Sequence, residues 1–272
     1  RQMCIRDRYG TNLEATNLEN ADFTNSTLDG STFRDSNLKN ADFTNAILDG
    51  STFRDSNLEN ANFNNAELKN VNLYKSNLIN TDFTNADATN ANFCGAYLAY
   101  MKFDNTIFRN TDLHNAKLMF SDLSTSIFEN TNFVGADLSN SNLKNQNLQN
   151  SNLYNVNLYG ANFDGVNLQN SNLRFANLIN TNLTNANLID ADFYNSTIKN
   201  TEFNGTLFNN TNFFGTSILD NYKPLHESEI IFEAKGNSII YSHYGFSVNS
   251  DDTLDIFSKD NLTGFIETFI ES

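Results

Sequence analysis

The chain has 272 residues and carries 32 acidic against 17 basic side chains, a net charge of −15. The sequence has no basic patch, which argues against binding nucleic acid through its phosphates. No apolar run approaches the roughly 20 residues of a membrane-spanning helix, and two cysteines, Cys4 and Cys94, make no disulfide framework.

Residues 1–10 do not fit the pattern that follows them. The segment from Arg1 to Arg8 resembles a translated sequencing adapter joined to a gene fragment, so we exclude residues 1–10 from the fold prediction. A genuine basic leader is the alternative. Under the adapter interpretation, the native N-terminus and any signal peptide or upstream domain would be missing, and the first coil would present an unprotected edge. The sequence does not fix the compartment, and we favour the cytoplasm.

From Thr11 to Asp220 a five-residue unit recurs 42 times without a change of phase. Its form is a small residue, Asn or an acid, a central Leu or Phe, and two polar residues, as in residues 61–65. A period of five fits neither a helix nor a simple strand. The centre and the residue two before it should share one face. The residue two after the centre is usually Asn, Gly or Asp and should form a corner with positive φ. Six units have another residue at this corner: Ala15, Lys75, Tyr100, Phe120, Thr125 and Phe175.

This pattern resembles the pentapeptide-repeat family, whose consensus is A(D/N)LXX, over residues 11–220. The resemblance implies an all-β protein, a right-handed, quadrilateral parallel β-helix solenoid with one coil per four units. About ten and a half coils at roughly 4.8 Å each would span about 50 Å. The sequence supports grouping by four independently, because residues 21–40 and 41–60 are near-copies. Ala88 is the only small central residue and predicts a gap unless a neighbour such as Phe108 fills it.

The repeat ends after Asp220, and the composition changes. Residues 221–228 contain the only proline, Pro224, and we expect them to form a linker. Residues 229–272 predict a short C-terminal β segment, which resembles a single, truncated β-propeller blade. A small β cap over the last coil is the alternative. The expected strands are Ile230–Ala234, Ser238–Tyr241, Gly245–Val248, Leu254–Phe257 and Gly264–Phe269.

Few side chains suggest chemistry. Cys94 and His114 should lie one coil apart on one outward ladder, but a structural zinc site needs four ligands. Asp29 and Asp49 form a pair of carboxylates that could suggest acid/base chemistry. Since they recur in near-duplicate coils, we interpret them as solvated repeat positions. We therefore predict a protein that is not an enzyme and that has no cofactor and no metal.

Aromatic side chains recur at outward positions of the repeat, which a solenoid does not need. Large apolar patches on soluble proteins usually mark interactions, so we predict a surface that binds a protein partner or a second copy. The alternative is that stacked aromatic residues only stabilise a β-ladder. The candidate partner-binding residues are Tyr74, Tyr154, Tyr159, Tyr194 and Phe214.

We predict a non-enzymatic structural or protein-interaction scaffold. The family resemblance implies a second function, since some pentapeptide-repeat proteins mimic duplex DNA and bind DNA gyrase or topoisomerase IV, which can give fluoroquinolone resistance. B-DNA carries about 30 charges over 50 Å, whereas residues 11–220 have 22 acidic against 11 basic residues. We therefore prefer the scaffold. Ice binding through Thr24, Thr44 and Thr84 is disfavoured because charged residues interrupt that array farther along.

Overall fold

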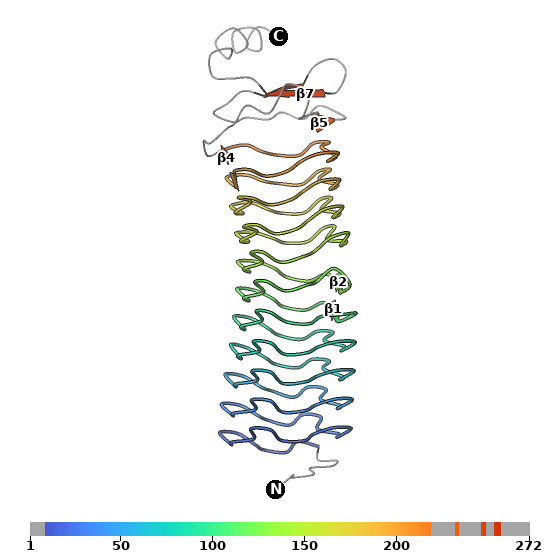
Figure 1. Ribbon diagram of the computed structural model, residues 1–272, viewed down its shortest axis with the longest axis vertical. Coiled ribbons are helices and arrows are strands. Elements are labelled where there is room, and N and C mark those ends of the chain that lie inside the picture. The colour runs from blue at the N-terminus through green and yellow to red at the C-terminus, as the bar shows by residue number, and fades with distance from the viewer. Residues whose placement is uncertain (1–8, 219–231, 234–245, 249–252, 257–272) are drawn as a thin grey trace. The chain divides into compact units, whose positions relative to one another are not determined.

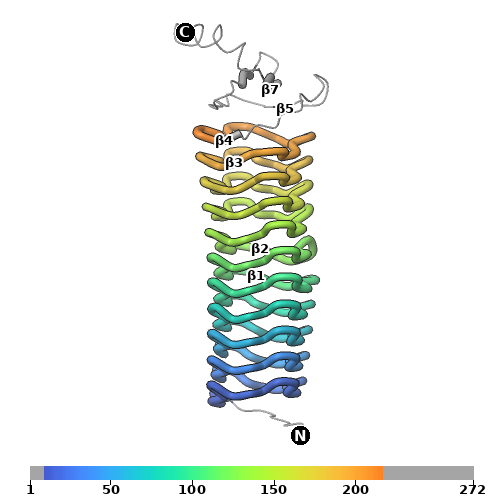
Figure 2. Tube along the Cα trace, turned by 60° about the vertical axis from the view of Figure 1, so that its left-hand side comes forward, coloured from blue at the N-terminus to red at the C-terminus, as the bar shows by residue number. Residues whose placement is uncertain are grey.

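The computed structural model describes residues 9–218, 232–233, 246–248 and 253–256. The chain divides into two compact units, which we call unit 1 (Arg1–Gln146) and unit 2 (Asn147–Ser272). In each unit the described repeat winds into stacked turns, blue to green for unit 1 and yellow to orange for unit 2 (Figure 1, Figure 2). No helix in the described part is long and apolar enough to cross a membrane. The strands are β1 (Ile107–Arg109), β2 (Ile127–Glu129), β3 (Thr197–Ile198), β4 (Ser217–Ile218), β5 (Phe232–Glu233), β6 (Phe246–Val248) and β7 (Thr253–Ile256).

Successive turns pair in parallel with a register of twenty residues. In unit 1, Asp22 pairs with Asp42, and β1 pairs with β2 so that Ile107 lies opposite Ile127. In unit 2, β3 pairs with β4 in the same register. Each turn therefore takes four five-residue units, which agrees with the predicted grouping by four. In the repeat, the pairing is built from single bridges and strands of two or three residues, because a corner interrupts every five-residue repeat.

The corners lie where the sequence predicts them, at the residue two after each centre. Asn45 has a φ of 56° and Gly50 a φ of 68°, and the same left-handed conformation recurs every five residues in both units. Asn adopts this conformation at lower cost than most residues. Several corner amides also form ladders, as where Asn40 Nδ2 donates to Asn20 Oδ1 at 3.1 Å.

The central side chains point inward and make the core. In unit 1, Phe43 stacks between Phe23 and Phe63 with ring centroids 4.7 Å apart on each side, and it meets Phe33 and Phe53 edge-on at 5.8 and 5.5 Å. These rings are fully buried, each a gain of about 1.5–3 kcal/mol relative to exposure. The packing in unit 1 therefore confirms that these central side chains share one interior.

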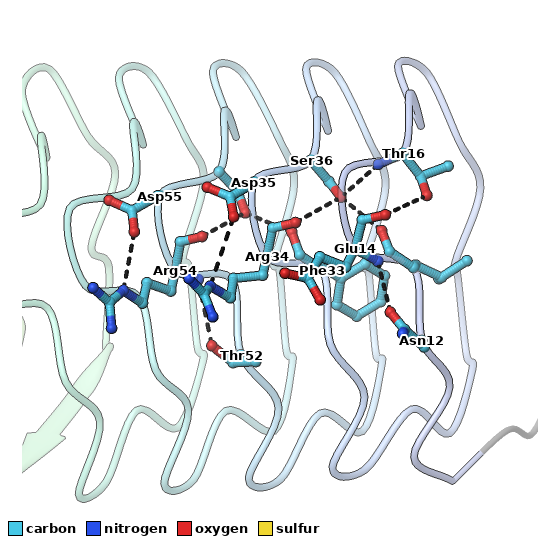
Figure 3. A network of polar contacts seen from close by, with 12 residues as sticks. Asn12, Glu14, Thr16, Phe33, Arg34, Asp35, Ser36, Thr52, Arg54 and Asp55 are labelled. Carbon is cyan, nitrogen blue, oxygen red and sulfur yellow. Dashed lines mark hydrogen bonds and ion pairs between the residues drawn. The ribbon is translucent and has the colours of Figure 1, made fainter.

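The small position two before the centre is buried as well and ties neighbouring turns together. Ser36 Oγ donates to the carbonyl of Leu13 at 2.6 Å and accepts from the N–H of Thr16 at 3.1 Å. Figure 3 shows this hydroxyl between two turns, with the ion pairs of Arg34 and Arg54 on the outward side. A larger side chain would occupy the space that the central rings fill.

The stack loosens around Ala88. The rings of Phe83 and Phe103 are 6.1 Å apart and tilted by 46°, unlike the parallel rings nearer the N-terminus. Phe108, one turn after Ala88, packs edge-on against Phe93 at 5.9 Å and Phe103 at 5.2 Å. Because Ala88 and Phe108 are both fully buried, this packing agrees with the expectation that Phe108 takes the space that Ala88 leaves.

Thr125 interrupts the corner pattern. Among the described corner residues from 15 to 215, only Thr125 does not have positive φ. A β-branched side chain strongly disfavours positive φ. The N–H of Asn105 donates to Thr125 Oγ1 at 3.2 Å, whereas the equivalent N–H of Asn85 donates to a backbone carbonyl. Gln146 Nε2 donates to the carbonyl of Ser124 at 2.7 Å. The buried Gln146 therefore satisfies a carbonyl that the irregular corner leaves without its usual donor.

Three of the five strands expected after the repeat lie in the described part. β7 pairs antiparallel with both β5 and β6, so that Leu254 lies opposite Phe232 and Val248. The expected strands Ser238–Tyr241 and Gly264–Phe269 lie outside the described residues, as do residues 1–8 of the predicted leader and the linker 221–228. The assignment of residues 229–272 to a blade or a cap stays a prediction.

Candidate protein-interaction surface

The outward position after each centre is fixed by the turn itself. The N–H of Tyr194 donates to Asp192 Oδ1 at 2.9 Å, and the N–H of Phe214 donates to Asn212 Oδ1 at 3.0 Å. Such a bond from an Asn or Asp side chain to the backbone two residues on stabilises the turn. The aromatic side chain that follows is left facing solvent, and Phe214 is 50% exposed.

Four aromatic residues of unit 2 form a continuous cluster, which we call the aromatic strip: Tyr154, Phe175, Tyr194 and Phe214. Phe175 meets Tyr154 edge-on at 5.3 Å and Tyr194 at 5.9 Å between ring centroids. Tyr194 stacks on Phe214 at 5.7 Å with the planes 13° apart. The twenty-residue register brings these rings together from successive turns.

Phe175 was not among the predicted partner-binding residues, although it connects two of them. It occupies a corner with a φ of 61°, and its side chain is 41% exposed. A bulky residue is unfavourable in this conformation, where Asn or Gly is usual. The exception at position 175 was visible in the sequence. The signal that could have identified it is an aromatic residue at a corner next to an aromatic ladder.

Arg174 gives the strip its electrostatic character. Its guanidinium carbon lies 4.6 Å from the ring centroid of Tyr194, within the range of a cation–π contact. Its Nε lies 3.9 Å from Asp192 Oδ2, and this Nε is buried without a hydrogen-bond partner among the described residues. The aromatic strip therefore combines four aromatic rings with one ion pair, in which the charges of Arg174 and Asp192 offset each other.

The other two predicted residues lie apart from the strip. Tyr74 belongs to unit 1, where Arg54 and Lys75 place their cations 4.9 and 5.1 Å from its ring centroid. Tyr159 is 43% exposed, and no ring contact joins it to the strip within the described part. The structure thus groups Tyr154, Tyr194 and Phe214, adds Phe175, and leaves Tyr74 and Tyr159 separate.

Unit 1 has a second exposed aromatic feature, which we call the corner pair: Tyr100 and Phe120. Their rings stack at 5.1 Å with the planes 3° apart, and the side chains are 58% and 51% exposed. Both residues have positive φ. The sequence marked them only as exceptions to the corner rule, so this feature was also missed as a surface.

Cys94 and His114 follow the turn geometry of their ladder. The N–H of Cys94 donates to Asn92 Oδ1 and that of His114 to Asp112 Oδ1. Burial raises the pKa of the Cys94 thiol, Asp112 raises this pKa further, and Lys75 lowers it. Among the described residues, no group of three or more His, Cys, Asp and Glu side chains could hold a metal ion.

Comparison with known proteins gives a match over nearly the whole repeat. The sequence profile described as pentapeptide repeats matches residues 9–45, 36–73, 66–98, 76–115, 95–130, 131–170 and 171–210. The comparison with curated proteins gave no match.

Several solved structures are similar to the chain. HetL, a pentapeptide repeat protein involved in heterocyst differentiation regulation from the cyanobacterium Nostoc sp. Strain PCC 7120, is 25% identical over 77% of this chain and 92% of that chain, with a TM-score of 0.30. A trypsin-treated form of QnrB1, a plasmid-mediated fluoroquinolone resistance protein, is 20% identical over 79% of this chain and 92% of that chain, with a TM-score of 0.33. Rfr23 from the cyanobacterium Cyanothece 51142 is 24% identical over 56% of this chain and 91% of that chain, with a TM-score of 0.26.

Proposed function

Because this chain belongs to the pentapeptide-repeat family, we propose that it is a non-enzymatic scaffold whose aromatic strip binds a protein partner or a second copy of the chain. The observation that carries the proposal is the unbroken series of ring contacts from Tyr154 through Phe175 and Tyr194 to Phe214. Aromatic residues and Arg are enriched at protein interfaces and dominate their binding energy. Arg174 places an arginine within the same surface as the aromatic rings.

The position of Phe175 distinguishes this proposal from simple stabilisation of the ladder. A ring that served only stability would sit at a position where the backbone is relaxed. Phe175 instead holds a left-handed corner, which costs of order 1–3 kcal/mol for a residue other than Gly. Backbone strain of this kind gathers at functional sites, which supports an interaction role.

The non-enzymatic character is supported by how the repeat uses its carboxylates. Asp42 Oδ1 accepts from the N–H of Thr44 at 2.9 Å and from its hydroxyl at 2.6 Å. Asp22 and Asp82 make the same pair of bonds with Thr24 and Thr84. These carboxylates close turns and are held as acceptors, which suits a structural role better than proton transfer.

The finer architecture is part of the same proposal. We infer that the four five-residue repeats of each turn form four sides and that the winding is right-handed. We also infer that residues 11–220 make about ten and a half such turns. The twenty-residue register and the corner at every fifth residue support four five-residue repeats per turn, whereas the right-handed winding rests on the family resemblance. We also propose the linker at 221–228 and a separate β segment from 229.

Sedimentation equilibrium of the full chain tests the proposed strip. The Tyr154→Ser/Tyr194→Ser/Phe214→Ser variant should reduce an oligomer to the monomer mass. Tyr159→Ser is the matched control, because Tyr159 is similarly exposed but lies outside the strip. It should leave the mass unchanged. An oligomer that keeps its mass in the triple variant would refute self-association through the strip.

A second candidate is mimicry of duplex DNA toward a type II topoisomerase such as DNA gyrase. The acidic excess favours unit 1, where residues 9–146 carry 17 acidic and nine basic side chains, against four and two in residues 147–218. Ion pairs with neighbouring carboxylates weaken this acidic surface, as at Lys39–Glu59 and Arg109–Glu129, both 3.0 Å. Gyrase supercoiling measured with increasing protein decides between the functions, since no inhibition at micromolar protein would eliminate mimicry.

A further inference from the structure

The corner pair of unit 1 breaks a ladder of asparagine residues. The corresponding corners before it are Asn20, Asn40, Asn60 and Asn80, and the one after it is Asn140. Asn60 Nδ2 donates to Asn40 Oδ1 at 3.2 Å and Asn40 Nδ2 to Asn20 Oδ1 at 3.1 Å. Tyr100 and Phe120 make no such bonds, and they hold φ values of 59° and 58° with bulky side chains.

Tyr100 and Phe120 are unfavourable for the local backbone, because the left-handed conformation of this corner favours Asn over bulky residues. An observed conformational outlier is a reason to look for a function. The two rings also expose large surfaces instead of burying them, at 58% and 51%. Tyr97, three residues before Tyr100, is also 53% exposed, and its register neighbour in the next turn is Lys117.

The outer faces of the two rings lack a cation of the protein's own. Elsewhere the protein places a cation over a half-buried aromatic ring, as Arg54 does at Tyr74 and Arg174 at Tyr194. Within the described residues no Lys or Arg lies over Tyr100 or Phe120. The flanking corners of the ladder are Asn80 and Asn140, which carry no charge. A cation over either outer face would therefore have to come from a partner.

The surface next to the corner pair is negatively charged, which would attract a partner that carries a cation. The side of the solenoid that follows this corner carries Asp82, Asp104 and Asp122 in successive turns. Lys102 lies between Asp82 and Asp122 in the register and pairs with Asp82 at 3.7 Å, so the net charge of the four side chains stays negative. Asp104 and Asp122 are both exposed. Asp122 Oδ1 accepts from the N–H and the hydroxyl of Ser124 and from Asn142 Nδ2, so a partner's cation would approach Oδ2. This acidic surface lies in the more acidic unit, so electrostatic steering would favour a basic partner.

We propose that the corner pair, together with Asp104 and Asp122, binds an extended segment of a partner protein that presents arginine beside apolar residues. The guanidinium groups lie against the outer ring faces and pair with the two carboxylates. Arg suits this site better than Lys because its planar group stacks on aromatic faces and can bond the Asp104 carboxylate in two places. The apolar residues of the segment pack against Tyr97. This surface uses residues of unit 1 only, and it goes beyond the proposed function of the aromatic strip.

Fluorescence anisotropy with a labelled peptide of alternating Arg and Leu tests the proposal on the full chain. The peptide should bind, and binding should weaken as salt rises. Tyr100→Asn/Phe120→Asn should weaken it by about tenfold, as expected for two lost cation–π contacts. Asp104→Asn should weaken it by about threefold and reduce the salt dependence. Ala15→Asn, an equivalent corner change in unit 1 outside both aromatic surfaces, should leave the affinity unchanged.

Several results would overturn the proposal. These are the absence of binding, equal affinity of the double variant and the wild type, or equal binding of a peptide with Glu in place of Arg. Sedimentation of the double variant provides the remaining test, because a dimer lost on this substitution would assign the pair to a second copy of the chain. Asn is the usual corner residue, so the double variant should fold, and circular dichroism checks this.

Discussion

The ring of Tyr100 lies parallel to the ring of Phe120 at 5.1 Å, while the backbone of both residues has positive φ. The two facts oppose each other energetically. An aromatic pair of this kind contributes about 0.5–1.5 kcal/mol beyond area burial, whereas a bulky residue in a left-handed corner costs about 1–3 kcal/mol. The stack therefore offsets only part of the strain at the two corners.

Replacing both rings with asparagine should make the protein more stable. In Tyr100→Asn/Phe120→Asn we expect the free energy of unfolding to rise by about 1 kcal/mol, since the corner strain falls more than the stacking energy. Urea denaturation followed by circular dichroism measures the change. A loss of more than about 1 kcal/mol would show that the stack stabilises the turns and that no strain is held there.

Enlarging Ala88 should destabilise unit 1. Ala88 is fully buried, and Phe108 of the next turn packs against Phe93 and Phe103 beside it. Ala88→Leu would force these rings apart, and overpacking a filled core costs about 1–3 kcal/mol. Thermal unfolding should therefore show a lower midpoint. A higher midpoint would mean that the core around Ala88 contains a void that Leu fills.

The Cys94 thiol should react slowly and respond in opposite directions to its two charged neighbours. Burial, with a contribution from Asp112, raises its pKa, so less thiolate is present at a given pH than in the unfolded chain. Asp112→Asn should lower the pKa and speed alkylation near pH 8. Lys75→Ala should raise it and slow the reaction. Iodoacetamide labelling in a Cys4→Ser background measures both rates, and changes of the same sign would contradict this assignment.

The sequence was sufficient to predict the structural features that recur in every five-residue repeat. The inward centres, the buried small position and the corner at every fifth residue follow from one period, and the structure confirms them at Phe43, Ser36 and Asn45. The twenty-residue register was also accessible, because two adjacent coils are near-copies. Each of these features depends on many equivalent residues, so a single exception does not hide the pattern.

The exceptions could be located in the sequence, but their consequences could not. Phe175 joins Tyr154 to Tyr194 across turns, which depends on where a corner side chain points. Thr125 leaves the left-handed conformation, and Gln146 compensates with a bond from the next turn. Such contacts join residues about twenty positions apart and depend on side-chain length, which periodicity does not report.

Every surface described here depends on the twenty-residue register, which disulfide trapping tests directly. Asn65 and Asn85 are corner neighbours, with Asn85 Nδ2 3.1 Å from Asn65 Oδ1. Strands in register lie about 4.8 Å apart, within the range that a disulfide spans. In a background with Cys4 and Cys94 replaced by Ser, Asn65→Cys/Asn85→Cys should oxidise to an intramolecular disulfide, identified by mass spectrometry after digestion. The control Asn65→Cys/Asn80→Cys should stay reduced, and a disulfide in the control pair instead of the first would contradict the register.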